Sequence, residues 1–158
     1  MVGVMGDVYF YHLTHQPLEV TLPMLLGKAR QAGWRVAVRG RSAERIEWLD
    51  NKLWLGAEDQ FLPHGRVGGE FDADQPILLT TALEAANDPA CVMAVDGAPV
   101  TSEEVTQRNR VCVLFDGNDP EALDVARGQW RALTKAGCRA KYWSQESGSW
   151  QMKAESGG

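Results

Sequence analysis

The chain of 158 residues lacks the short motifs that mark common nucleotide and hydrolase sites. A phosphate-binding loop would be a glycine-rich turn between the first strand and its helix, but the turn at residues 12–17, HLTHQP, has no glycine. No G-x-x-x-x-G-K-[ST] loop and no G-x-S-x-G nucleophile elbow occurs anywhere. We therefore expect neither catalytic nor cofactor-binding residues.

Cysteine is scarce, and long apolar runs are missing. Three cysteines, an odd number without a C-x-x-C pair, fit reduced core residues of a cytosolic protein better than disulfides or a metal site. The N-terminal segment has no basic region followed by a long apolar stretch, and no window is apolar enough to span a membrane. The sequence predicts a cytoplasmic protein without membrane contact.

The histidines and aspartates that could serve in metal binding or catalysis do not form a recognisable motif. His12 and His15 have no cysteine or carboxylate at ligand spacing, so we interpret them as structural. Asp7, Asp96 and Asp116 lie at strand ends, where α/β enzymes often hold acids, but each adjoins a glycine and is as well explained as a turn former. We expect no metal site and no acid–base pair.

Chain length and net charge limit the number of domains and the kinds of partner that we expect. A chain of 158 residues with 44% hydrophobic content can bury one core, which predicts a single domain. The formal net charge of -5 disfavours strong direct binding to nucleic acid, because phosphate contacts need cations.

Strand-like and helix-like segments alternate along the chain. Apolar, β-branched runs predict five strands, and helical periodicity follows Pro17, Ser42 and Asp119; the predicted strands are 7–13, 34–39, 76–81, 91–95 and 111–115. Short connections between such elements indicate βαβ units. The predicted fold is α/β, a single Rossmann-like domain with a mainly parallel sheet flanked by helices and no nucleotide-binding glycine loop.

The end of the chain predicts a closing hairpin. Residues 139–144 and 150–153 have the composition of two paired strands around a polar turn. We expect the domain to cover residues 1–153 and residues 154–158 to form a disordered tail.

The clearest element is a helix from Pro120 to Gly137, capped by Asn118 or Asp119. Helical spacing divides it into an apolar face and a basic face, with Leu123 and Trp130 between them. The apolar face holds Ala122, Val125, Ala126, Leu133 and Ala136, and the basic face holds Arg127, Arg131 and Lys135.

No acidic residue occurs between Val125 and Gln145, although Arg139 and Lys141 add to the basic residues of this window. The alternative to a binding site is a solvated helix face without a partner. However, such a face usually contains acids for i, i+4 pairing, and a tryptophan beside arginines provides an apolar contact next to planar cations. The pattern favours binding of a short acidic peptide with a hydrophobic end.

Six segments in this order carry a resemblance to a known family: VYFYHLT at the first strand, Leu53-Trp54, residues 61–65 (FLPHG), residues 74–79 (DQPILL), residues 114–117 (LFDG) and residues 126–131 (ARGQWR). From about Gly6 to Lys153 the chain resembles the chi subunit of bacterial DNA polymerase III.

The resemblance implies a non-catalytic connector in the clamp-loader assembly, which binds the acidic, Phe-terminated C-terminal tail of single-stranded DNA-binding protein. The tail site of the family is implied at Arg127, Trp130 and Arg131 of this sequence. One further basic position of that site is Leu123 here, and Lys135 or Arg139 is a candidate replacement.

The resemblance also implies a second surface, which faces the psi subunit or another replication or repair protein. It is implied at Trp54 and Phe61, with Pro63 and His64 in the same motif.

Two other classes of function stay open at this point. A small Rossmann-like transferase is one, since this fold hosts many chemistries, although the glycine turn is missing. A direct single-strand binder that uses the basic face and the tryptophans as stacking surfaces is the other.

Overall fold

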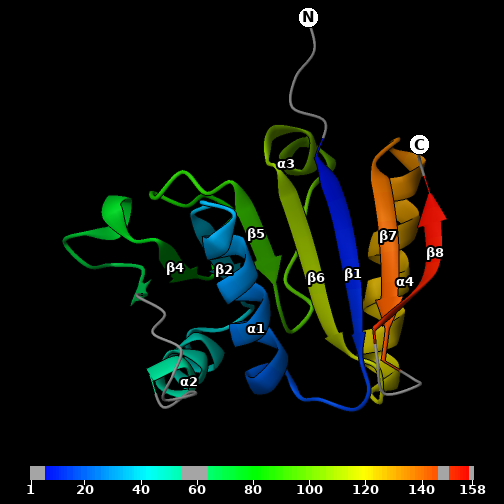
Figure 1. Cartoon of the computed structure of the whole chain (residues 1–158), viewed down its shortest axis with the longest axis horizontal. Coiled ribbons are helices and arrows are strands. Elements are labelled where there is room, and N and C mark those ends of the chain that lie inside the picture. The colour runs from blue at the N-terminus through cyan, green and yellow to red at the C-terminus, as the bar shows by residue number, and fades with distance from the viewer. Residues whose placement is uncertain (1–5, 55–63, 146–149, 157–158) are drawn as a thin grey trace, which may run out of the picture.

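A computed structural model describes residues 6–54, 64–145 and 150–156. Eight strands form one sheet in the order β3-β4-β2-β5-β6-β1-β7-β8, with helices on both sides (Figure 1). The strands are β1 Asp7–Leu13, β2 Val36–Arg39, β3 Gly65–Arg66, β4 Ile77–Thr80, β5 Cys91–Ala94, β6 Arg110–Asp116, β7 Arg139–Ser144 and β8 Gln151–Ser156. The helices are α1 Leu18–Gln31, α2 Ala43–Trp54, α3 Ser102–Gln107 and α4 Pro120–Lys135, with a 3-10 turn at Asp72–Asp74.

The sheet is parallel except for its last strand. β1 lies between β6 and β7 and is parallel to both, whereas β8 pairs with β7 in the antiparallel direction. The predicted class, a single Rossmann-like α/β domain with a mainly parallel sheet, is confirmed.

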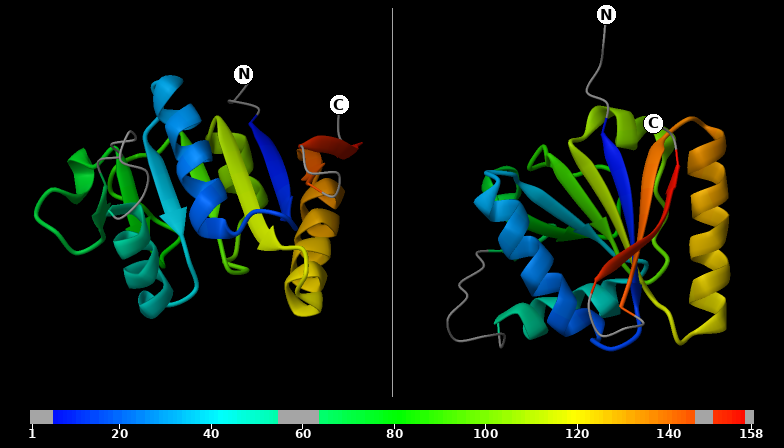
Figure 2. Two further views of the ribbon diagram at one scale, coloured as in Figure 1. Left: turned by 60° about the horizontal axis from the view of Figure 1, so that its bottom comes forward. Right: turned by 45° about the vertical axis from the view of Figure 1, so that its right-hand side comes forward.

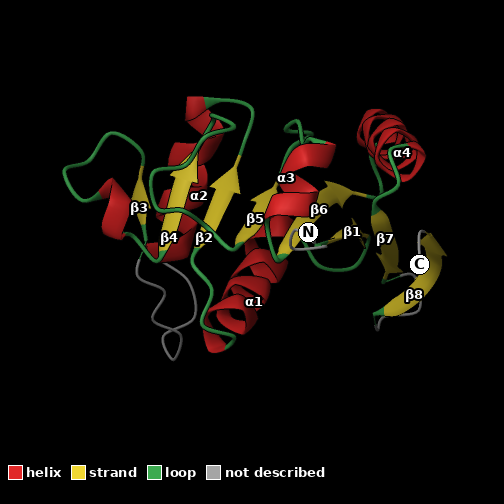
Figure 3. Ribbon diagram, turned by 90° about the horizontal axis from the view of Figure 1, so that it is seen from above, coloured by secondary structure: helices red, strands yellow, loops and turns green. Residues whose placement is uncertain are grey.

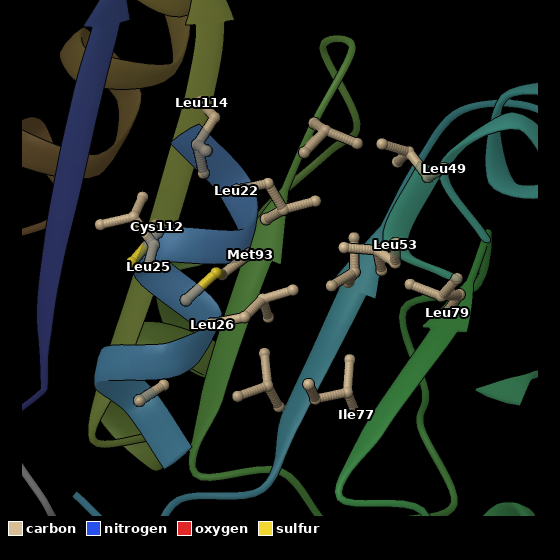
Figure 4. Packing of buried hydrophobic residues seen from close by; sticks show 14 of the residues in the cluster. Leu22, Leu25, Leu26, Leu49, Leu53, Ile77, Leu79, Met93, Cys112 and Leu114 are labelled. Atoms are coloured by element: carbon tan, nitrogen blue, oxygen red, sulfur yellow. The ribbon is translucent and has the colours of Figure 1, made fainter. Parts of the chain in front are cut away.

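Side chains alternate between the two faces of each strand, and each face has its own core. On one face, α1 and α2 pack against the sheet, with Leu22 and Leu26 of α1 near Met93 (Figure 4). On the other face, α3 and α4 cover Val8, Phe10 and neighbouring residues. Viewed from above, α1 and α4 lie on opposite sides of the sheet (Figure 3).

Capping residues and glycines in the sequence mark most of the helix ends. Ser42 Oγ accepts from the backbone N–H of Arg45 at 3.2 Å, as expected of the cap of α2. Asp119 Oδ1 accepts from the N–H of Glu121 at 3.0 Å, so Asp119 rather than Asn118 caps α4. Gly33 and Gly137, with φ of +82° and +92°, follow the ends of α1 and α4.

Helix α3 was not predicted, although the sequence carries its signal. Thr101 and Glu104 form a capping box in which the Thr101 hydroxyl accepts from the Glu104 N–H and the Glu104 carboxylate accepts from the Thr101 N–H. The T-x-x-E spacing would have located this helix of six residues.

A buried ion pair connects α3 to the sheet. Arg39, at the end of β2, is 1% exposed and binds both carboxylate oxygens of Glu104 at 2.8 and 2.9 Å. Its other guanidinium hydrogens go to the carbonyls of Ala82, Leu83 and Pro99. Arg39 therefore connects the end of β2 with the loops that follow β4 and β5 and with α3.

Two expectations need correction. Residues 154–156 are not a disordered tail, because β8 continues to Ser156 through its pairing with β7. On α4, Val125 is 40% exposed and Ala136 is exposed, whereas Leu123 and Trp130 pack against the core.

Candidate partner-binding surface

The predicted basic face is on the outside of α4, which stands at one flank of the sheet in Figure 2. Arg127, Arg131 and Lys135 are all exposed. The side chain of Arg127 is 66% exposed, and its ion pair with Asp124, at 3.9 Å, is long and open to solvent. We call these three residues the basic ridge; its cations can bind an incoming anion without breaking a buried contact.

Trp130 and Leu123 lie where the basic ridge meets the core. The Trp130 ring makes edge contacts with Phe10 at 5.4 Å and with Tyr142 at 6.0 Å. The Tyr142 hydroxyl is 2.7 Å from His12 Nδ1. Trp130 is thus half-buried and fixed by aromatic neighbours, and it offers part of its surface beside Arg127.

These supporting aromatic residues were not identified from the sequence. Phe10 and His12 belong to β1 and Tyr142 to β7, so parallel pairing of two strands distant in sequence brings them under α4. In the sequence, only the alternation of side chains along the first strand indicated that His12 lies on the same face of the sheet as Phe10.

The basic residues between Val125 and Gln145, which we call the basic window, are divided between two faces of the sheet. Arg139 lies opposite Asp7 in the register and forms an ion pair with it at 2.9 Å, while the Lys141 ammonium lies 5.6 Å from the centre of the Tyr9 ring. Asp7, Tyr9, Arg139 and Lys141 belong to the face that alternates away from Phe10 and α4. Arg139 therefore lies on the other face of the sheet from Leu123, and Lys135 is about 18 Å from Leu123 along the axis of α4.

The second predicted surface is described only in part. Trp54 is the last residue of α2, and Phe61 and Pro63 lie outside the described residues. His64 is buried, and its Nε2 is 3.1 Å from Asp50 Oδ1 of α2. Its side chain joins the start of β3 to α2 and presents no surface to a partner.

The acids at strand ends have structural contacts. Arg45 binds both oxygens of Asp96, at 2.9 and 3.1 Å, and this hydrogen bonding raises the pKa of Arg45. Asp116 accepts from the backbone N–H of Asn118, as a turn former does. Within the described residues, no group of three or more His, Cys, Asp or Glu side chains is arranged to hold a metal ion.

The cysteines are free and buried, as expected of core residues. A hydrogen bond with Cys112, and then burial, raise the pKa of the Cys91 thiol, and burial raises the pKa of Cys138. Among the helices in the described ranges, none combines the length and apolar character needed to cross a membrane.

Fold and surface together define a Rossmann-like α/β protein whose clearest functional feature is an exposed cationic helix. Residues 5–141 match the family described as DNA polymerase III chi subunit, HolC. The chain is 20% identical over 120 residues to the probable DNA polymerase III subunit chi of Rickettsia prowazekii (strain Madrid E), covering 73% of each chain. This chain belongs to the DNA polymerase III chi subunit family, which supports an accessory role in DNA replication.

Proposed function

We propose that this protein links a DNA polymerase III assembly to single-stranded DNA-binding protein by binding the acidic C-terminal tail of that protein at the basic ridge. The basic ridge itself carries the proposal, because Arg127, Arg131 and Lys135 are exposed on one helix, and their one ion pair within the described ranges is the weak contact of Arg127 with Asp124. Half-buried Leu123 and Trp130 beside them suit a hydrophobic terminal residue.

The contacts follow from ordinary electrostatics. Arg127 and Arg131 bind tail carboxylates through charge-assisted hydrogen bonds, each contributing roughly 1.5 to 3 kcal/mol if desolvated and less if exposed. The tail's terminal ring packs at Trp130. A short, open site of this kind gives a dissociation constant on the order of micromolar, about -8 kcal/mol, and several tails on one partner raise the avidity.

The protein acts as a connector without catalytic activity of its own, in the cytoplasm where the replication assembly works. A second partner, psi or another replication or repair protein, binds near Trp54 and Phe61. His64 is buried against Asp50 of α2, so its part is to fix the start of β3 to that helix.

The test is a titration of the protein against a labelled peptide with the acidic, Phe-terminated tail of single-stranded DNA-binding protein from the same organism. Fluorescence anisotropy should give micromolar binding that weakens with added salt, because exposed charges are screened. Arg127→Ala should weaken binding about tenfold or more.

Arg139→Ala is the matched control, since Arg139 belongs to the same basic window but lies on the other face of the sheet. It should bind the peptide like the native chain. Equal loss with both variants would show that only net charge matters, and binding unaffected by Arg127→Ala would exclude the basic ridge as the site.

A further inference from the structure

The sheet leaves part of one face open on the side of α1. In Figure 1, α1 lies in front of the sheet beside β5, α4 lies behind β7, and none of the described helices lies in front of β1, β7 or β8. Tyr9 of β1 and Lys141 of β7 are direct neighbours in the register and point to this open side. Both are only half-buried, so this part of the sheet presents side chains to solvent.

Aromatic rings make up most of the open face. The centre of the Tyr9 ring lies 6.3 Å from the centres of both Tyr11 and Trp143, and the Tyr11 ring lies 5.3 Å from that of Trp150. Trp34, which follows α1, packs against the same core as Tyr9 and Tyr11. All five rings are half-buried, and each keeps part of its surface toward solvent.

Two cations lie over these rings without an acidic partner. The Arg110 guanidinium carbon is 4.2 Å from the centre of the Tyr9 ring and 5.1 Å from that of Trp34, and Lys141 Nζ is 5.6 Å from the centre of Tyr9. Neither cation forms a hydrogen bond or an ion pair with any of the described residues. Of the Arg110 guanidinium nitrogens only Nε is buried, so the two terminal nitrogens keep access to solvent. We call the five rings and these two cations the cationic aromatic face.

The charge around this face is positive, although the whole chain is acidic. Arg139 is neutralised by Asp7 at 2.9 Å, and Glu155 lies opposite Lys141 in the register of β7 and β8. Arg30, near the end of α1, donates from Nη1 to a backbone carbonyl at 2.8 Å and adds a further cation at the border of the face. The cations therefore outnumber the acids here, which suits an anionic partner.

The alternative of a direct single-strand binder combined the basic ridge with the tryptophans. The structure separates these two groups, because Trp130 is the only tryptophan of α4, whereas Trp34, Trp143 and Trp150 lie on the cationic aromatic face. Stacking by several rings is thus available on this face and not on the basic ridge.

Single-stranded DNA has the chemistry that matches these side chains. Its phosphates supply anions for Arg110 and Lys141, and its unpaired bases stack on aromatic rings or on a guanidinium plane. An open sheet face that carries aromatic side chains is a common platform for such strands. An acidic protein segment would use the cations and leave the flat rings without a stacking partner.

We propose that the cationic aromatic face binds single-stranded DNA, with phosphates on Arg110 and Lys141 and bases against the neighbouring rings. The net charge of -5 opposes the approach of a polyanion, so the dissociation constant is on the order of 10⁻⁴ M at physiological salt. This binding is a property of the chain alone and does not rest on recognition of the tail at the basic ridge.

The test is an NMR titration of the ¹⁵N-labelled full chain with a short oligo(dT) at low salt, beside an abasic strand of the same length. Oligo(dT) is expected to shift the indole N–H signals of Trp34 and Trp150 and the amide signals of Tyr9 and Lys141. It should bind about tenfold more tightly than the abasic strand, because stacked bases add affinity. Equal affinity for the two strands would show that charge alone is recognised, as by an acidic protein partner, and would overturn the proposal. Shifts confined to Trp130 and the basic ridge, or no shifts at all, would overturn it too.

Variants of equal charge separate this face from the basic ridge. Lys141→Ala breaks no hydrogen bond among the described residues; it should weaken oligo(dT) binding about threefold and reduce the slope of log K against log salt by about 0.7, the share of one phosphate contact. Arg110→Ala should weaken binding at least as much, with circular dichroism to check its fold. Arg131→Ala, on the basic ridge, is the matched control and should bind oligo(dT) like the native chain. Equal weakening by Lys141→Ala and Arg131→Ala would show that only net charge matters and would contradict the assigned contacts.

Discussion

At the scale of single residues, the ion pair of Arg39 and Glu104 is the most completely buried charged contact among the described residues. Every donor of the Arg39 guanidinium is used inside the protein, by one carboxylate and three carbonyls. The sequence showed only an arginine at the end of a strand, because the partner lies 65 positions away. A contact of that range has no local signal.

We expect Glu104→Ala to lower the free energy of unfolding by about 3 to 5 kcal/mol, because it leaves a buried charge unpaired. Urea denaturation followed by circular dichroism measures this. Arg139→Ala, which breaks a partly exposed pair with Asp7, should cost less, about 1 to 2 kcal/mol. Similar losses in both variants would show that burial of Arg39 is energetically unimportant.

Leu123 is the position where the family resemblance implies a basic residue. The side chain is half-buried at the edge of the core beside Trp130, and a lysine there can keep its stem on the core while its ammonium reaches solvent. Leu123→Lys should therefore tighten binding of the tail peptide by roughly two- to fivefold, as measured by anisotropy. Unchanged or weaker binding would place the tail away from this end of the basic ridge.

At the scale of elements, local chemistry predicted helix ends better than helix faces. Asp119 and Pro120 fix the start of α4. The spacing of apolar residues placed Val125 on the apolar face of this helix, yet Val125 is 40% exposed and Trp130 packs inward. Which flank of a helix meets the sheet depends on neighbouring strands, and periodicity alone does not contain that information.

The cap of α4 gives a direct test. Asp119→Ala should lower the free energy of unfolding by about 0.5 to 2 kcal/mol, and Asn118→Ala by less than about 0.5 kcal/mol, in the same urea experiment. If Asn118→Ala has the larger effect, the capping residue has been assigned wrongly.

At the scale of the whole molecule, the fold separates two groups of cations that are adjacent in sequence. The basic ridge lies on α4, and Arg139 and Lys141 lie on the opposite face of the sheet with Asp7 and Tyr9. The fold class was predictable because strand and helix patterns alternate along the chain. This division was not, because it depends on the register of β7 against β1.

The three cysteines report on the integrity of the whole fold. All are buried, and the pKa values of Cys91 and Cys138 are raised, so the reactive thiolate is disfavoured in the native protein. Native protein should react with a thiol reagent at neutral pH far more slowly than protein in denaturant. Rapid reaction of any cysteine in the native state would reveal local opening.

The central claim is that the basic ridge holds the tail of single-stranded DNA-binding protein. The most direct measurement is calorimetric titration of the native chain and an Arg127→Glu/Arg131→Glu variant against that intact protein, with and without its acidic C-terminal tail. The account predicts salt-sensitive, micromolar or tighter binding to the intact partner, because several tails act together, and loss of binding when either the tail or the ridge charges are changed. Undiminished binding to the tailless partner, or by the charge-reversed variant, would contradict it.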